Sequence, residues 1–226
     1  LSVCYLANVW NIGAEGQLHL GAITATGVAL FMLPAAPAFV LLPVMVLAGF
    51  TGGAVWGLIP GALRAYFKVN EIITSLMLNY VAILLGEYLV YGPWKNPQGM
   101  GFPGTAPFPD AAWLPRLSPT RVHAGLLLGL LAAATVFVIL RRTWWGYEIR
   151  VIGENERAAR YAGINITRNI LLVMALSGGL AGIAGMSEVS GIAHALQRGL
   201  SPGYGYTAII VAWLAKLNPW AVVLVA

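Results

Sequence analysis

Six long apolar runs follow one another along the chain, separated by segments of polar and small residues. The runs cover roughly residues 18–33, 38–59, 70–92, 122–140, 169–192 and 206–226. Each approaches the ~20 residues that an α-helix needs to cross the hydrocarbon core of a bilayer, and none shows the period-two alternation of barrel strands. The pattern predicts an all-α fold, a polytopic bundle of transmembrane helices that forms one domain over residues 1–226.

The composition supports a membrane protein. Of the 226 residues, 59% are hydrophobic and 9% are charged, against about 25% charged residues in soluble domains. The formal net charge is +5, but the basic residues occupy the connections between the apolar runs, so the charge does not indicate nucleic-acid binding. Cys4 is the single cysteine, which excludes an internal disulfide, and we interpret it as a small apolar residue of a helix.

Lysine and arginine are distributed unevenly over the connections. If residues 141–168 are cytoplasmic, alternation of the spans also places residues 60–69 inside and residues 93–121 outside. The inside segments then hold Arg64, Lys68, Arg141, Arg142, Arg150, Arg157, Arg160 and Arg168, and the outside segments hold Lys95, Arg116, Arg121 and Arg198. By the positive-inside rule, this excess predicts a multi-pass protein with residues 141–168 in the cytoplasm.

The connection of residues 141–168 carries the pattern of a short helix. Polar residues that can cap and charge a first turn precede a run of small and basic residues and a terminating glycine. These residues are Gly153, Glu154, Asn155, Glu156, Arg157, Ala158, Ala159, Arg160 and Gly163. Two interpretations stay open from the residues alone. The helix is either a solvated connection or a docking helix, whose alanines let a partner's groove close and whose arginines pair with acids on its rim.

Two stretches have the pattern of interrupted helices. Residues 11–17, NIGAEGQ, precede an apolar run, and Gly13 and Gly16 can release the backbone from helical pairing. A second glycine-rich start lies in residues 199–219, GLSPGYGYTAIIVAWLAKLNP. In transporters, interrupted helices place free backbone groups at a site near the bilayer midplane, so we expect the amides of residues 11–17 to point toward a cavity.

Polar residues at or within the apolar runs are the candidate substrate contacts. An ionisable group at the centre of a span costs ~2.5–3.5 kcal/mol on insertion scales, so it needs a partner or a watery cavity. We predict a substrate path lined by Asn11, Glu15, Gln17, Asn79 and Glu188. For Asn79 a hydrogen bond to a neighbouring helix is the alternative, and for Glu188 a structural role is equally open. Glu71 and Glu87 are interpreted as interfacial residues at span ends.

The chain carries no recognisable catalytic or metal-binding motif. Residues 176–179, LSGG, match the start of the signature of ABC ATPases, but no phosphate-binding G-x-x-x-x-G-K-[ST] accompanies them. We interpret them as a packing face, because Gly178 and Gly182 form the G-x-x-x-G of close helix contacts. The three histidines lack ligand spacing, and Asp110 is the only aspartate. We therefore expect no enzyme activity, no metal and no cofactor bound by this chain.

Four segments together resemble a known family. NIGAEGQLHLGA, GLIPGALRAYFKVNEIITSLMLNYVA, GYEIRVIGENERAARYAGI and GYTAIIVAWLAKLNP are similar to the membrane subunits of ABC importers for nucleosides. These belong to a broader permease group that also serves simple sugars and branched-chain amino acids. The resemblance implies alternating access along a path between the spans, and it implies that residues 153–163 form the coupling helix.

The resemblance also implies an assembly. A second, related permease, two cytoplasmic ABC ATPases that use ATP and an extracytoplasmic substrate-binding lipoprotein would complete the importer in the cell membrane of a prokaryote. Its other partners would be membrane lipid and a small-molecule substrate. The family pattern implies a fragment that lacks helices at both ends, and His19 stands where an apolar residue is expected. Three alternatives stay open: a permease for simple sugars or branched-chain amino acids, an ion-coupled secondary transporter, and a structural membrane scaffold.

Overall fold

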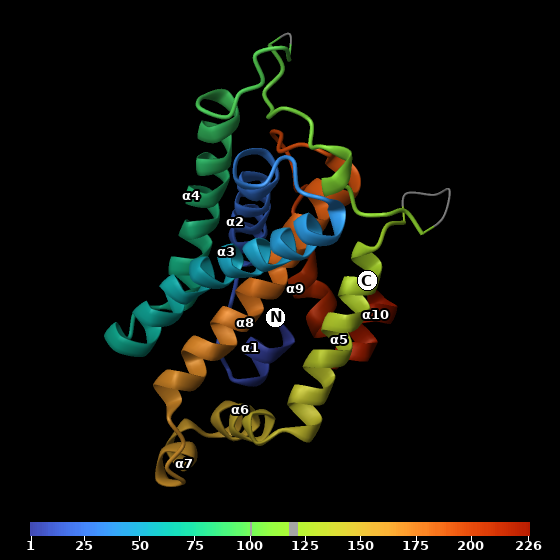
Figure 1. Ribbon diagram of the computed structural model, residues 1–226. Coiled ribbons are helices and arrows are strands. Elements are labelled where there is room, and N and C mark those ends of the chain that lie inside the picture. Colours follow the sequence, from blue (N-terminus) through green and yellow to red (C-terminus); the bar gives the residue numbers. More distant parts are fainter. Residues whose placement is uncertain (100, 118–121) are drawn as a thin grey trace.

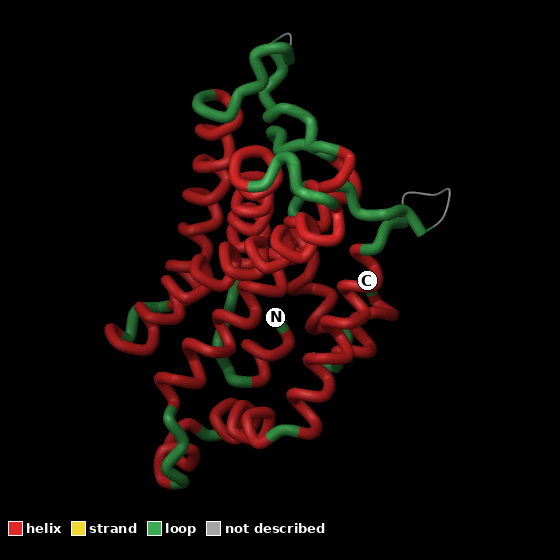
Figure 2. The backbone as a smooth tube through the Cα atoms, in the orientation of Figure 1, coloured by secondary structure: helices red, strands yellow, loops and turns green. Residues whose placement is uncertain are grey.

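The computed structural model describes residues 1–99, 101–117 and 122–226, and Figures 1 and 2 show helices and loops throughout these residues. The helices are α1 (Ser2–Leu6), α2 (Ala14–Gly27), η1 (Val28–Met32), α3 (Ala38–Phe67), α4 (Glu71–Tyr91), η2 (Asp110–Ala112), α5 (Gly125–Arg142), α6 (Trp144–Glu154), α7 (Glu156–Tyr161), α8 (Ile166–Glu188), η3 (Val189–Ala193), α9 (Tyr204–Leu214) and α10 (Pro219–Val225). Of these, η1 and η3 are π-helical and η2 is a 3-10 turn. Arg121, one of the basic residues assigned to the outside, lies outside the described residues.

Four helices are long and apolar enough to cross a membrane: Ala38–Phe67, Glu71–Tyr91, Gly125–Arg142 and Ile166–Ala193. The pair of Tyr204–Leu214 and Pro219–Val225 passes the same test together but is bent by 118° at the break between its two helices. The prediction of an all-α polytopic membrane bundle is therefore confirmed. The single run expected over residues 206–226 is wrong in detail, because Asn218 caps a new helix at Pro219 and the chain changes direction there.

Helix α2 is the central element of the bundle and packs against α3, α4, α8 and α9 (Figure 1). The apolar pattern placed its beginning near residue 18, whereas the helix begins at Ala14 and continues through η1. Glu15 and Gln17 are consequently buried inside the bundle, with 2% and 1% of their surface exposed. Their burial requires hydrogen-bond partners from the surrounding helices.

Glycines bring α3 and α8 into close contact. A Cβ atom added at Gly182 would lie 2.0 Å from the carbonyl oxygen of Gly49, and one added at Gly178 would lie 2.3 Å from that of Gly53. Only glycine leaves room for backbones to approach this closely. The interpretation of residues 176–179 as part of a packing face is confirmed.

Helix α3 is longer than the sequence pattern indicated. The segment around Pro60, expected to separate two spans, continues the helix as far as Phe67, and both Pro43 and Pro60 lie inside it. Prolines are tolerated within membrane helices because neighbouring helices satisfy the backbone groups that they free. The chain turns instead at Lys68, which has a left-handed backbone (φ 59°).

The connection expected as one short helix contains two. The first, α6, is capped by Thr143 and buries Gly146, Ile149 and Ile152 against the bundle. The second, α7, is capped by Asn155, as predicted, and the chain leaves it at Gly163 with a positive φ of 76°. Glu154 is the last residue of α6, so its assignment to the first turn of α7 is wrong. Both helices lie at the lower end of the molecule in Figure 1.

Candidate functional site

The beginning of α2 holds a cluster of buried polar side chains. The amide nitrogen of Asn11 donates to Gln17 Oε1 (2.9 Å) and to the Ser177 hydroxyl (3.0 Å), and Gln17 Nε2 donates back to Asn11 Oδ1 (3.1 Å). Asn11 is fully buried and Ser177 is 3% exposed. The two side-chain amides bind each other, and the bond to Ser177 ties the break before α2 to the middle of α8.

Glu15 joins the two interrupted helices. Its carboxylate accepts a hydrogen bond from the backbone N–H of Gly205 (2.7 Å), in the first turn of α9. A carboxylate at this position accepts from a backbone N–H that has no partner within its own helix, and its negative charge complements the positive end of α9. A Cβ atom at Gly205 would lie 2.3 Å from the Glu15 nitrogen, so the helix beginnings touch through their backbones.

Asn79 of α4 completes the junction of α2 and α9. Its Oδ1 accepts from the Gly16 N–H (2.8 Å), while its Nδ2 donates to the Ile12 carbonyl (2.9 Å) and to the Tyr206 hydroxyl (3.2 Å). This is the cross-helix bond considered for it as an alternative. We call Asn11, Glu15, Gln17, Asn79, Ser177 and Tyr206 the junction cluster.

Three of the backbone amides expected to point toward a cavity are instead bound inside the bundle. The N–H groups of Ile12, Gly13 and Gly16 donate to side chains, those of Ser75, Asn11 and Asn79 respectively. Buried backbone groups released from a helix need such partners, and here the neighbouring helix α4 supplies two of them. In this conformation the break is sealed within the bundle.

Glu71 lies at a span end, as expected, because it is the first residue of α4, and it is also a buried structural group. The side chain pairs with Arg64 of α3 and accepts from the Trp10 N–H (3.2 Å), while Arg64 also donates to the Asn8 carbonyl (3.0 Å). The pair thus fixes the chain between α1 and α2 to the ends of α3 and α4. Glu87, the other glutamate interpreted in this way, lies one turn from the end of α4 and pairs with Arg198.

Glu188 is not part of the junction cluster. It is the last residue of α8, eleven positions beyond Ser177, which corresponds to ~16 Å along a helix. The structure therefore brings together four of the five residues predicted to line a path and leaves the fifth apart.

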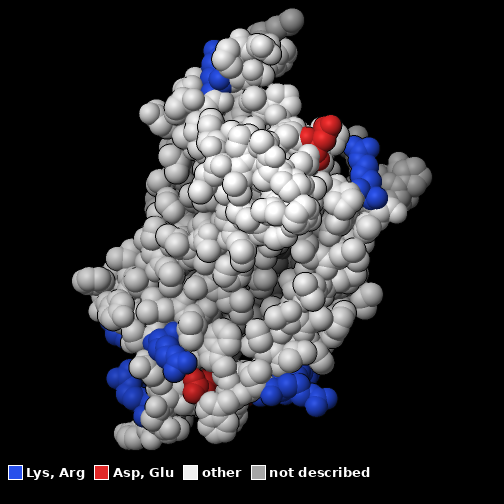
Figure 3. All heavy atoms as spheres, viewed as in Figure 1, with Lys and Arg blue, Asp and Glu red and all other residues white. Residues whose placement is uncertain are grey.

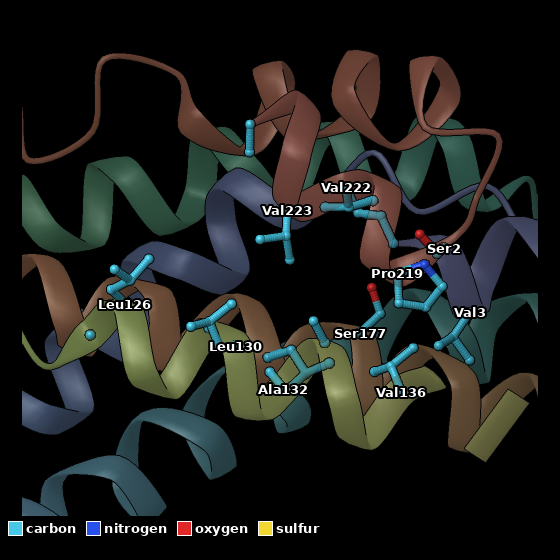
Figure 4. Close-up of a pocket in the computed structure, with 16 residues that line it drawn as sticks. Ser2, Val3, Leu126, Leu130, Ala132, Val136, Ser177, Pro219, Val222 and Val223 are labelled. Atoms are coloured by element: carbon cyan, nitrogen blue, oxygen red, sulfur yellow. The ribbon is translucent and has the colours of Figure 1, made fainter. Parts of the chain in front are cut away.

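An apolar cleft of about 490 Å³ lies beside the junction cluster, between α5 and α10 (Figure 4). Leu126, Leu130 and Val136 of α5 face Val222 and Val223 of α10 across it. An adjoining cavity of about 400 Å³ reaches along α8 to Gly205 at the beginning of α9. Both are bordered by Ser177, whose hydroxyl is therefore the point where the junction cluster meets the cleft.

Basic side chains gather at the lower end of the molecule, while the middle of the visible face carries no charge (Figure 3). We call this the basic end. It comprises α6, α7 and the adjoining ends of α3, α5 and α8, and its exposed basic residues are Lys68, Arg141, Arg142, Arg150, Arg157, Arg160 and Arg168. Tyr161 is 94% exposed at the end of α7, and Glu156 pairs with Arg160 (3.2 Å).

The basic end is packed directly against the first interrupted helix. A Cβ atom at Gly153 of α6 would lie 1.9 Å from the carbonyl oxygen of Leu6, the last residue of α1. Ala159 of α7 is fully buried in an apolar cluster with Ile166 and Ile170 of α8. The two helices of the basic end are therefore in contact with both α1 and α8.

Two histidines meet at the end opposite the basic end. Burial lowers the pKa of both His123 and His194 below the ordinary value of 6.5, and the other ring lowers that of His123 further. His194 stacks on Trp113 with ring centroids 4.1 Å apart, and His123 Nδ1 accepts from the Gly125 N–H (3.1 Å). Both rings are neutral at neutral pH and pack the loop onto the end of α8.

Two members of the junction cluster were not predicted from the sequence. Ser177 lies in the LSGG segment, which the sequence distinguishes only by its glycines, and Tyr206 lies in the glycine-rich first turn of α9. Their polar groups stand out only once α2, α4, α8 and α9 are placed side by side.

Comparison with known proteins gives consistent results. The family of branched-chain amino acid transport system permease components matches residues 1–226. A glucose ABC transporter permease of Haloferax volcanii is 42% identical over 93% of the chain and 57% of its own length. A guanosine ABC transporter permease of Bacillus subtilis is 33% identical over 100% of the chain and 65% of its own length. A nucleoside ABC transporter permease of Lactococcus lactis is 28% identical over 100% of the chain and 64% of its own length.

The chain spans less than two thirds of the length of these relatives. No solved structure matches it significantly. The family model nevertheless covers every residue of the chain, and the helices described above have the lengths and hydropathy of a membrane permease. This chain belongs to the family of branched-chain amino acid transport system permease components.

Proposed function

We propose that the chain is part of the membrane permease subunit of an ATP-driven importer for nucleosides. Its family supports the class, and the names of two relatives, a guanosine and a nucleoside permease, support the substrate. The observation that carries the proposal is the family match across the whole chain. It is supported by α7, an exposed helix whose Ala159 is buried in the bundle and which could dock on an ATPase. A simple sugar is the second candidate, because the glucose permease of Haloferax volcanii is the relative with 42% identity.

The proposed assembly follows the same reasoning. A second related permease, two ABC ATPases and an extracytoplasmic binding lipoprotein would accompany the chain in the cell membrane of a prokaryote. The basic end would face the cytoplasm, where the positive-inside rule places clustered arginines. ATP would be bound and hydrolysed by the partner subunits, and this chain would supply the path and its coupling.

The proposed coupling runs through α6 and α7. Closure of the ATPases would move α7, and the contacts of Ala159 with α8 and of Gly153 with α1 would carry the movement into the bundle. Arg64, Glu71 and Glu156 line one hollow at this end, so α7 also neighbours the ion pair that holds the break. Rigid packing of this kind transmits small displacements as discrete rearrangements.

The proposed path lies along the cleft between α5, α8 and α10. Asn11, Glu15, Gln17 and Asn79 are sealed in this conformation, and Ser177 is their link to the cleft. They would reach substrate only after α9 moves away from α2 and exposes their amide and carboxylate groups. Such groups suit the hydroxyls and base edges of a nucleoside. Glu188, at the end of α8 away from the basic end, stays a proposed contact of the substrate.

The test is uptake of radiolabelled adenosine and glucose by vesicles that carry the full-length permease, its partner subunits and the binding protein, with and without ATP. We expect ATP-dependent uptake of adenosine. Tyr161→Ala removes an aromatic ring with almost no contact inside the chain, and loss of a docking anchor of this kind weakens binding by about tenfold or more.

Phe102→Ala is the matched control, because this ring is 79% exposed at the opposite end. We expect Tyr161→Ala to lower both the recovery of the ATPase subunits with the permease and the ATP-dependent uptake, while Phe102→Ala leaves ATPase recovery unchanged. Uptake that is independent of ATP, with both variants behaving like the parent protein, would assign the chain to ion-coupled transport and overturn the proposal.

A further inference from the structure

A small cavity lies between α2, α4 and the loop that precedes α9. Its volume is about 160 Å³, and it is lined by His19 and Ile23 of α2, by Ile83, Gly86 and Glu87 of α4, and by residues 196–201. These residues of α4 belong to its last three turns, far from Glu71 at the basic end. The cavity therefore opens toward the end of the molecule opposite α7. It shares no lining residue with the cleft of Figure 4.

His19 presents an unused nitrogen in this cavity. Its Nδ1 lies 2.9 Å from the Glu15 carbonyl oxygen, which can only accept, so Nδ1 carries the hydrogen of this bond. In the neutral ring Nε2 is then an acceptor, and it has no hydrogen-bond partner among the described residues. The residue is only 9% exposed. A polar side chain buried in a membrane bundle and facing a cavity indicates a functional site.

The cavity wall also contains an ion pair and a hydroxyl group. Arg198 Nε donates to Glu87 Oε1 (3.1 Å), so the two opposite charges compensate each other. The Ser201 hydroxyl accepts from the N–H groups of Gly203 and Tyr204, which leaves its own hydrogen available. Ile23, Ile83, Leu196 and Leu200 supply the apolar part of the lining.

Size and chemistry together define the ligand. A dry apolar cavity of about 150 Å³ accommodates one benzene molecule, so this cavity has room for a single ring. A sugar ring has hydroxyls that both donate and accept, and C–H faces that pack against aliphatic side chains. Arg198 and Glu87 are paired with each other, so neither offers an uncompensated charge that would attract an anion or a cation. A purine base is a poorer fit, because the cavity lining contains no Phe, Tyr or Trp on which a base would stack.

We propose that this cavity, the His19 site, binds the sugar ring of the substrate at the outer end of the permease, with His19 Nε2 accepting from a ring hydroxyl. The proposal rests on the proposed function and deepens it, because a sugar ring is common to a nucleoside and a hexose. It also accounts for the histidine at a position where the sequence led us to expect an apolar residue.

Protection of an introduced cysteine tests the site directly. Gln197→Cys places a thiol on the cavity lining, and Gln98→Cys places one on an exposed loop at the same end. Cys4 is fully buried, so it adds no background labelling. The full-length variants, free of other accessible cysteines and assembled with their partners in sealed vesicles, are treated from outside with a membrane-impermeant maleimide. The additives are adenosine, D-ribose, D-glucose and adenine.

We expect adenosine and D-ribose to slow labelling at position 197, adenine to have no effect, and no additive to slow labelling at position 98. Protection by D-glucose alone would also support a sugar-ring site and would favour the hexose candidate. His19→Leu removes the acceptor but keeps a side chain of similar bulk, so protection should require about tenfold more ligand, the loss of one buried hydrogen bond. Leu84→Phe, on the exposed face of α4, is the control that should change nothing.

Uptake by the same vesicles separates two kinds of failure. If ATP-dependent uptake is present but none of the sugar-containing additives protects position 197, the His19 site is refuted and the proposed function stands. Equal protection by adenine and adenosine would refute the assignment to a sugar ring. If the vesicles take up neither adenosine nor glucose, the proposed function fails and the His19 site fails with it.

Discussion

At the residue scale, Glu15 shows how a polar residue can hold a membrane bundle together. The sequence suggested a substrate contact, whereas the structure makes its carboxylate the cap of α9, with an oxygen 2.7 Å from the Gly205 nitrogen. The bond spans 190 positions of the chain and is buried. Hydrogen bonds that involve a charged group contribute about 1.5–3 kcal/mol, so this one is a substantial part of a marginal stability.

Glu15→Ala should therefore destabilise the assembled permease as well as impair transport. We expect a loss of about 1.5–3 kcal/mol, because the Gly205 amide would stay buried without its partner. The measurement is the thermal unfolding midpoint of the purified complex, with Gln98→Ala as a surface control. A midpoint equal to that of the parent protein, together with lost uptake, would show that Glu15 acts on substrate and that α9 does not depend on it.

At the element scale, short helices outside the spans are positioned by close backbone contacts. Gly153 of α6 touches Leu6 of α1, just as Gly182 of α8 touches Gly49 of α3. A close contact transmits displacement because neither backbone can yield without moving its helix. The α6–α1 contact thus connects the basic end to the chain that precedes the junction cluster.

Gly153→Ala tests this connection. The added methyl would overlap the Leu6 carbonyl, and overpacking of this kind costs about 1–3 kcal/mol. We expect ATP hydrolysis by the partner subunits to persist while uptake per ATP falls. Gly27→Ala on α2 is the matched control, because a Cβ atom there would lie 3.6 Å from its nearest neighbour, which is an ordinary contact. Unchanged uptake per ATP in Gly153→Ala would exclude the α6–α1 contact from coupling.

At the scale of the whole molecule, charge distinguishes the two ends. The exposed arginines of α5, α6, α7 and the start of α8 occupy one end, while Lys95, Arg116 and Arg198 are the basic residues described at the other. Between them lies a belt of exposed apolar residues on α3, α4 and α5, as expected for surfaces that contact lipid or another subunit. The asymmetry supports one orientation in the membrane.

Ala158→Cys and Gln98→Cys test that orientation. Both positions are exposed, one on α7 and one on the loop after α4. In intact cells an impermeant thiol reagent should label position 98 at once and position 158 only after permeabilisation. The reverse result would invert the proposed topology and place α7 out of reach of cytoplasmic ATPases.

The sequence by itself determined the class of protein, the approximate positions of the spans and the local helix signals. Long apolar runs specify membrane helices because a bilayer demands a span of nearly constant length. Asn155 and Gly163 bounded α7 correctly because capping depends on neighbours within a few residues. The glycine face of α8 was equally readable, since its spacing lies within one helix.

Only the tertiary structure decided the roles of the polar residues. Asn11, Glu15 and Asn79 each have a hydrogen-bond partner 63 to 190 positions away, and no local pattern indicates which side chains meet over such separations. The same holds for the bonds of Glu71 to Trp10 and of Arg64 to Asn8, which join residues 61 and 56 positions apart. It also holds for the cavity that His19 lines, which exists because α2, α4 and residues 196–201 converge. Hydropathy places a helix in the membrane, but long-range packing decides whether its polar groups are buried between helices or exposed to a ligand.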